Sequence, residues 1–231
     1  WFGIFAIPVL IRVPEIPARE RENRTGFIGS YRVLWATITK LWQSDRQLLA
    51  FLLASAVFRD GLAGVFTFGA IIAAQVFGFT TSGVLQFAVA ANVVAEVSTI
   101  VAGRFDDRFG PKNVIVTSLV ALIVTGTTVL FIGTAQIGFW IAGLTLCAFV
   151  GPIQSASRTF LSRITPEGRE GEIFGLYATT GRAVSFLAPG LFALIVELSD
   201  DTRLGILGII IVLAMGLLLM IPVKARQSEI S

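Results

Sequence analysis

Histidine does not occur in this 231-residue chain, and cysteine occurs only once, as Cys147 inside an apolar stretch. Without histidine, the chain cannot form His-dependent catalytic triads, His metal sites or His-ligated haem. A single cysteine cannot form a disulfide or a cysteine-based metal site within the chain. Charged residues are also scarce, at 14% of the chain, whereas soluble domains carry about 25%. Because most common active-site designs are removed, we expect no enzyme, no metal and no cofactor.

Whereas histidine, cysteine and charged residues are absent or scarce, apolar residues are abundant. They make up 55% of the chain, and the mean hydropathy is +0.81. The net charge of +3 could indicate a nucleic-acid partner, but no stripe of aromatic and basic residues lies on a polar surface. An excess of Lys and Arg is typical of the cytoplasmic loops of membrane proteins. The composition therefore predicts an all-α membrane protein with lipid, not nucleic acid, around it.

Six apolar stretches are long enough to cross a bilayer, which takes about 20 helical residues. They run over residues 48–77, 83–102, 114–133, 138–157, 172–196 and 204–223. Ser44 or Asp45 can cap the first of these helices. Fifteen of the eighteen Lys and Arg residues lie in every second connector or end segment, and only Arg203 lies in the connectors between. This alternation predicts six spans with both chain ends in the cytoplasm.

The six-helix bundle, 48–223, has flanking segments of a different character. Residues 1–11 are apolar but too short for a span, and we interpret them as the end of a transmembrane helix whose start is missing, in a piece of a longer protein. Residues 12–47 form a cytoplasmic central loop, where the apolar spacing over Tyr31–Trp42 predicts an amphipathic helix. That helix could lie on the membrane interface or pack on protein. Residues 224–231 form a cytoplasmic tail.

Charged residues inside the predicted spans are the first candidates for function. They are Arg59 and Asp60 in the first span, Glu96 in the second and Arg182 in the fifth. A charge at the helix centre costs about 2.5–3.5 kcal/mol on insertion scales, so it persists where it lines a cavity or meets a partner. Asp60 could pair with Arg182 or with Arg59, and Glu96 could bind a proton or a cation. A solute or ion pathway and a purely structural ion pair both remain open.

Two spans contain a proline beside a glycine, Gly151-Pro152 in the fourth and Pro189-Gly190 in the fifth. Each proline removes a backbone hydrogen bond, which predicts a helix break. In transporters such breaks often lie beside binding sites, although a passive kink that improves packing is the alternative. Gln154 follows the first break and adds a polar group to the predicted pathway.

The connector after the second span carries a glycine- and charge-rich pattern at fixed spacing: Gly103, Asp107, Arg108, Gly110 and Lys112. The glycines allow a tight turn with close helix packing. An acid at this place can face the positive N-terminal end of a neighbouring helix. The pattern resembles the signature loop of the major facilitator superfamily, between the second and third helices of each six-helix half. Asn113 departs from it, since many members carry a second basic residue there.

Three further segments look like one branch of that superfamily: Arg59–Gly61, Gly151–Arg158 and Pro166–Tyr177. They resemble the vacuolar, autophagy-associated amino-acid effluxers and their bacterial relatives. The resemblance covers nearly the whole chain and aligns it to the C-terminal half. It implies one half of a twelve-helix fold, whose two halves rock about a site near the bilayer midplane. It also implies a bacterial plasma membrane as the location.

The resemblance therefore implies a secondary active transporter of a small solute such as an amino acid, with protons as a candidate coupling ion. The implied partner is a missing N-terminal six-helix half, with a helix end that Asp107 would meet when the cytoplasmic gate is closed. A lipid-moving member of the superfamily is one alternative. A half-size, dimerising membrane subunit that serves as a scaffold or receptor is another, and the upstream reading frame would distinguish it.

Overall fold

The computed structural model of this chain describes residues 7, 38–39, 41–43 and 45–224. The chain divides into two units, Trp1–Thr39 and Lys40–Ser231, and every helix discussed below belongs to the second. The predicted helix end at 1–11, most of the loop at 12–47 with its amphipathic helix, and nearly all of the tail lie outside the described residues. Those expectations stay predictions.

Four long, continuous helices follow one another in the first part of the bundle. They are α3 (Arg46–Gln75), α4 (Thr81–Phe109), α5 (Pro111–Phe131) and α6 (Gln136–Ile164). Each covers one of the first four predicted spans. The Asp45 side chain accepts a hydrogen bond from the N–H of Leu48 at 3.1 Å, so the predicted cap at Asp45 is confirmed.

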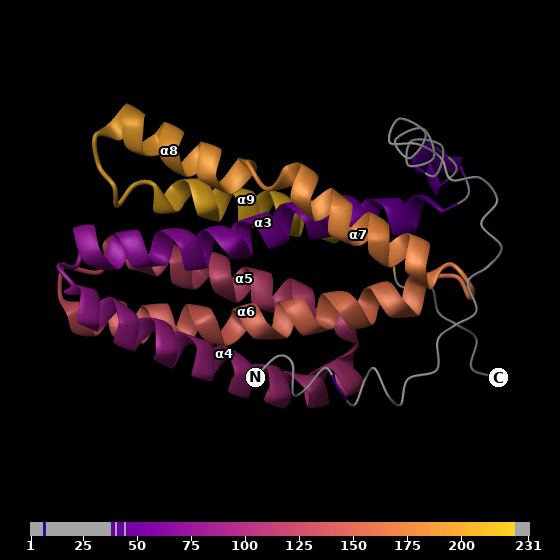
Figure 1. The fold of residues 1–231 in the computed structure, drawn as a ribbon, viewed down its shortest axis with the longest axis horizontal. Coiled ribbons are helices and arrows are strands. Elements are labelled where there is room, and N and C mark those ends of the chain that lie inside the picture. Colours follow the sequence, from indigo (N-terminus) through magenta and orange to yellow (C-terminus); the bar gives the residue numbers. More distant parts are fainter. Residues whose placement is uncertain (1–6, 8–37, 40, 44, 225–231) are drawn as a thin grey trace. The chain divides into compact units, whose positions relative to one another are not determined.

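The fifth predicted span is divided into two helices, α7 (Glu170–Val184) and α8 (Leu187–Ser199). Figure 1 shows them following one another with a bend between them. Pro189 lies in the first turn of α8, where its missing N–H would have no partner inside the helix. The predicted break in this span is confirmed, and it lies just before the proline. The last helix, α9 (Ile206–Met220), has 15 residues and is shorter than its predicted span.

The other predicted break, at Gly151-Pro152, is wrong. α6 runs through Pro152 without interruption, and the proline is buried. A Cβ on Gly151 would collide with the Thr99 side chain and with the backbone carbonyl of Ala95 on α4. α4 therefore packs closely against this stretch, and α6 stays helical through it although Pro152 has no N–H to donate.

The connectors alternate between the two ends of the bundle (Figure 1). At one end, Gln136 donates to the carbonyl of Gly78 at 3.0 Å, which joins the α3–α4 turn to the start of α6. At the other end, the Lys112 ammonium donates to the carbonyl of Ile221 at 2.8 Å, which joins the start of α5 to the end of α9. Successive spans, with α7 and α8 counted as one, therefore run in opposite directions, as the alternation of basic connectors predicts.

The core of the bundle forms around α3. In α3, 72% of the most apolar stretch is buried inside the bundle, whereas in α4 only 17% of that stretch is buried. The rings of Phe51 on α3 and Phe160 on α6 are 4.6 Å apart, and both are fully buried. Gly216 of α9 lies so close to Phe58 of α3 that a Cβ there would be 2.6 Å from the Phe58 Cβ. Small residues let helices approach closely in lipid, where no hydrophobic effect drives them together.

The described part of the chain is helical and contains no strand. Five helices, with α7 and α8 taken together, are long and apolar enough to cross a membrane, and α9 is a shorter apolar helix. The predicted fold class, an all-α helical membrane protein, is confirmed.

Candidate functional site

Asp60 lies near the middle of α3 and is 5% exposed. Its Oδ2 accepts a hydrogen bond from the N–H of Ala188 at 2.6 Å, and the N–H of Leu187 faces the same carboxylate. Both amides belong to the first turn of α8, which receives no capping hydrogen bond from its own N-cap side chain. The first N–H groups of a helix have no partner within it, and they carry partial positive charge. Asp60 therefore caps α8 from another helix.

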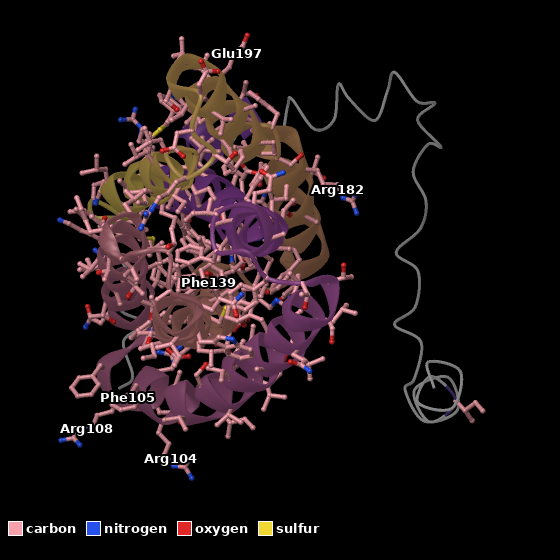
Figure 2. All side chains as sticks on the ribbon, turned by 90° about the vertical axis from the view of Figure 1, so that its left-hand side faces the viewer. Arg104, Phe105, Arg108, Phe139, Arg182 and Glu197 are labelled. Carbon is pink, nitrogen blue, oxygen red and sulfur yellow. The ribbon has the colours of Figure 1, made fainter. Side chains whose placement is uncertain are left out.

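This arrangement differs from both ion pairs expected for Asp60. The salt bridge found among the described residues joins Arg169 and Glu172, and neither Arg182 nor Arg59 pairs with Asp60 there. The Arg182 side chain is exposed and points away from the bundle (Figure 2). The physical reason is that backbone amides at a helix N-terminus can stabilise a buried carboxylate without a cation.

Arg59, the residue before Asp60, holds the other half of the divided span. Its Nη1 donates to the carbonyl of Tyr177 on α7 at 3.0 Å, and its guanidinium carbon lies 4.0 Å from the centre of the Tyr177 ring. A Cβ on Gly181 would lie 3.1 Å from Nη1, so the glycine leaves room for the guanidinium. The two residues, which we call the α3 pair, thus bind α7 through Arg59 and α8 through Asp60.

Sequence reasoning missed Tyr177 as a member of this site. Its ring is buried, and it stacks parallel to Phe51 at 6.5 Å. A signal was present, because Ile173, Tyr177 and Gly181 recur every four residues and so share one face of α7. Ile173 is fully buried, and this face packs on α3.

The remaining predicted pathway residues lie elsewhere on the bundle. Glu96 on α4, Gln154 on α6 and Arg182 on α7 are all exposed, whereas Asp60 is buried. We call these three side chains the polar face. The structure therefore separates the predicted pathway residues into the α3 pair, with Asp60 buried and Arg59 half-buried, and three exposed side chains on three other helices.

The signature loop forms a turn between α4 and α5. Gly110 is its only residue outside the two helices, and its φ of 81° is in the region that favours glycine. Asp107 and Arg108 are exposed at the end of α4, while Lys112 reaches α9. The tight turn is confirmed. A Cβ on Gly103 would meet nothing within 4 Å among the described residues, so the close packing expected there is not seen.

Asp106, which the sequence reasoning passed over, is the buried acid of this loop. It is 8% exposed, and it faces Thr159 and Arg163 of α6. Its Oδ1 has no hydrogen-bond partner within the described residues. Asp106 lies seven residues after Thr99, which packs against α6 at Gly151, and this spacing places both on one face of α4. The helical spacing could have distinguished the buried Asp106 from the exposed Asp107.

The connector before α7 is held by local contacts outside the spans. The Arg169 guanidinium donates two hydrogen bonds to Glu172, at 2.9 and 3.1 Å, and these bonds raise the pKa of Arg169 above its usual value. Gly168, with a φ of 77°, donates its N–H to the side chain of Glu170. Acidic residues in the first turn of α7 also complement its N-terminal partial charge.

Comparisons with known proteins agree with the membrane character of the bundle. The family model described as "Vacuole effluxer Atg22 like" matches residues 1–230. The chain is 26% identical over 228 residues to YxiO of Bacillus subtilis, an uncharacterised MFS-type transporter, and the match covers 99% of this chain and 52% of YxiO. It is 24% identical over 248 residues to the autophagy-related protein 22 of Cryptococcus neoformans, which covers 98% of this chain and 44% of that protein. The chain thus spans about half the length of these relatives.

Proposed function

Because the chain belongs to the Atg22-like vacuole effluxer family, we propose that it is the C-terminal half of a secondary active transporter that moves a small solute by alternating access. The chain is an integral membrane protein of a transporter family. Its match to about half of each relative supports the assignment to one six-helix half. We further propose amino acids as the solute class, in line with the resemblance of its motifs to amino-acid effluxers.

The observation that carries this proposal is the α3 pair beside the divided fifth span. Ionisable residues in the middle of a membrane span are costly, and they mark solute paths or proton relays more often than they serve packing. Discontinuous helices near the midplane form the binding sites of many secondary transporters. Here two adjacent charged residues bind the two halves of one such helix, at the carbonyl of Tyr177 and the N–H of Ala188.

We propose a mechanism in which the Asp60 contact changes during transport. A proton or an amine bound to Asp60 would weaken its bond to the amides of α8, because those amides bind the charged carboxylate best. The N-terminus of α8 would then be able to accept the carboxylate of a solute. The bend between α7 and α8 would change with this exchange, while Arg59 kept α7 on α3.

The polar face supplies the proposed wall of the pathway toward the absent half. The Arg182 guanidinium can bind a solute carboxylate, and Glu96 can bind an amine, a cation or a proton. Gln154 adds a neutral hydrogen-bonding group. Asp107 is exposed at the end of α4 and is the group that we expect to meet a helix end of the absent half. The excess of basic residues at this end supports a cytoplasmic location, and the YxiO match supports a bacterial plasma membrane.

A flux assay on the full-length protein tests the proposal. The protein would be reconstituted in vesicles, and uptake of a panel of amino acids would be measured with and without a pH gradient. We expect Asp60→Asn to lower the flux of the transported solute at least about tenfold and to flatten its pH dependence, because the amide cannot take up a proton.

The matched control is Glu197→Gln, which makes the same chemical change at an exposed position of α8 (Figure 2). We expect it to keep the wild-type flux. Unchanged flux and pH dependence in Asp60→Asn would remove Asp60 from the site. Solute binding without any flux in the wild-type protein would favour a receptor over a transporter.

A further inference from the structure

A cavity of about 850 Å³ lies between α4 and α5, and we propose that it binds an acyl chain of an anionic membrane phospholipid whose phosphate is held at Arg108. Its volume is at the upper end of the range for small-molecule sites. The walls are almost entirely apolar and include Val97, Phe105 and Phe109 of α4, Val114 of α5, and Phe149 and Pro152 of α6. This inference depends on the helices spanning a membrane and is independent of solute transport.

The shape of the cavity, which we call the α4–α5 groove, follows from the signature loop. α4 ends at Phe109, α5 begins at Pro111, and only Gly110 separates them. The two helices therefore meet at this end, and α6 closes the floor of the space between them. The lining runs along α4 from Phe109 to Val93, which is about 24 Å at 1.5 Å per residue. Half of the hydrocarbon core of a bilayer is about 15 Å thick, so the groove can take a long part of one acyl chain.

The groove opens on a different side of α4 from the polar face. On α4, Ala95 and Thr99 face α6 and contact it at Gly151. Successive residues turn by about 100°, so Glu96 lies about 200° around the helix from Ser98, which lines the groove. Figure 2 shows Phe105 and Arg108 on one side of the bundle and Arg182 on the other. The side that carries Arg182 is the one we assign to the absent half, and the groove side is left to lipid.

Charge at the closed end of the groove selects an anionic headgroup. The Arg108 guanidinium carbon lies 5.4 Å from the centre of the Phe109 ring, which lines the groove. Arg104 is also exposed on α4, and the Asn113 side chain adds a polar group at the same end. The exposed acid of this segment, Asp107, offsets only one of the two arginines. Basic pockets between helices at the cytoplasmic side are suited to anionic lipid headgroups.

Photocrosslinking tests the acyl-chain part of the proposal. The full-length protein would be reconstituted in phosphatidylcholine vesicles that contain a small fraction of phosphatidylglycerol with a diazirine in its acyl chain. We expect crosslinks to concentrate on the lining residues of α4 and α5, as mapped by mass spectrometry. Val97→Trp, which fills the groove, should lower these crosslinks at least about fivefold. The control is Val124→Trp, at an exposed α5 position that does not line the groove, and it should leave them unchanged.

A second comparison tests the headgroup. We expect the phosphatidylglycerol probe to label the groove several times more than a phosphatidylcholine probe with the same chain. Arg108→Gln should remove this preference, whereas Lys224→Gln, which removes an exposed positive charge outside the groove, should keep it.

Three results would overturn the inference. One is labelling spread evenly over the exposed faces of α5 and α9. Another is groove labelling that Val97→Trp leaves unchanged, or that shows no preference for the anionic headgroup. The third is efficient crosslinking of Phe105→Cys to a helix of the N-terminal half, which would show that protein covers the groove.

Discussion

The two spans that contain a glycine–proline pair, at Gly151-Pro152 and at Pro189-Gly190, behave differently. α6 continues through Pro152, whereas the fifth span divides into α7 and α8 just before Pro189. The two spans differ in the helix that packs against them at the proline. α4 presses on Gly151 and keeps α6 continuous, while Asp60 of α3 supplies an acceptor for the amides that the division of α7 and α8 leaves without a partner. A proline in a membrane helix therefore permits a break, and the adjacent helix determines whether one forms.

The largest effect is expected from removing the acceptor that stabilises the break. Asp60→Leu leaves the N–H of Ala188 buried without a partner, and an unsatisfied backbone group in the membrane interior costs several kcal/mol. We expect a loss of stability on the order of 3 kcal/mol, measured by denaturant unfolding of the full-length protein in detergent. Asp60→Asn keeps an acceptor and should lose only about 1 kcal/mol. Equal losses in the two variants would show that the carboxylate does not cap α8.

A smaller effect is expected where α4 keeps α6 continuous. Gly151→Ala places a methyl group against Thr99 and the carbonyl of Ala95, and overpacking of this kind costs about 1–3 kcal/mol. Gly190→Ala is the matched control, because a Cβ there meets nothing within 4 Å among the described residues. The control should stay within about 0.5 kcal/mol of wild type in the same unfolding assay. If Gly151→Ala is as stable as the control, α4 does not pack against α6 at Gly151 as closely as the structure shows.

The smallest effects are expected from the prolines themselves. Pro189→Ala adds an N–H in the first turn of α8, where it has no partner within the helix, so no gain in stability is expected. Pro152→Ala restores a donor in the middle of a continuous helix, and a gain of up to about 1 kcal/mol is expected. Thermal unfolding of both variants measures the difference. A larger gain in stability from Pro189→Ala than from Pro152→Ala would contradict the difference between the two spans.

Much of the fold could be predicted from the sequence because a lipid environment allows few kinds of structure. Every span must be apolar and helical, and basic residues mark one end, so the alternation of connectors follows from composition. The turn at Gly110 and the cap at Asp45 follow from local chemistry that neighbouring residues determine. The division of the fifth span was signalled by Pro189, although the exact position depends on α3.

The site was less accessible to sequence reasoning, because its partners are backbone groups. A sequence displays charged side chains, and these predict an ion pair of Asp60 with Arg182 or with Arg59. The amides of Leu187 and Ala188 have no signature of their own and become binding groups only when the helix is interrupted beside them. The carbonyl of Tyr177, which accepts a hydrogen bond from Arg59, has no sequence signature either. Asp106 was a different case, since the helical spacing from Thr99 could have revealed it.

The position of the α3 pair constrains how this helix can vary. α3 has 30 residues, more than a bilayer needs, so residues can be added or lost at its C-terminal end. A single residue inserted between its buried N-terminal half and Arg59 would rotate both side chains by about 100° and detach α7 and α8 together. Insertions and deletions should therefore be tolerated at the C-terminal end of α3 and not before Arg59. The structure therefore constrains the direction in which Arg59 and Asp60 point around the axis of α3, whatever the thickness of the membrane.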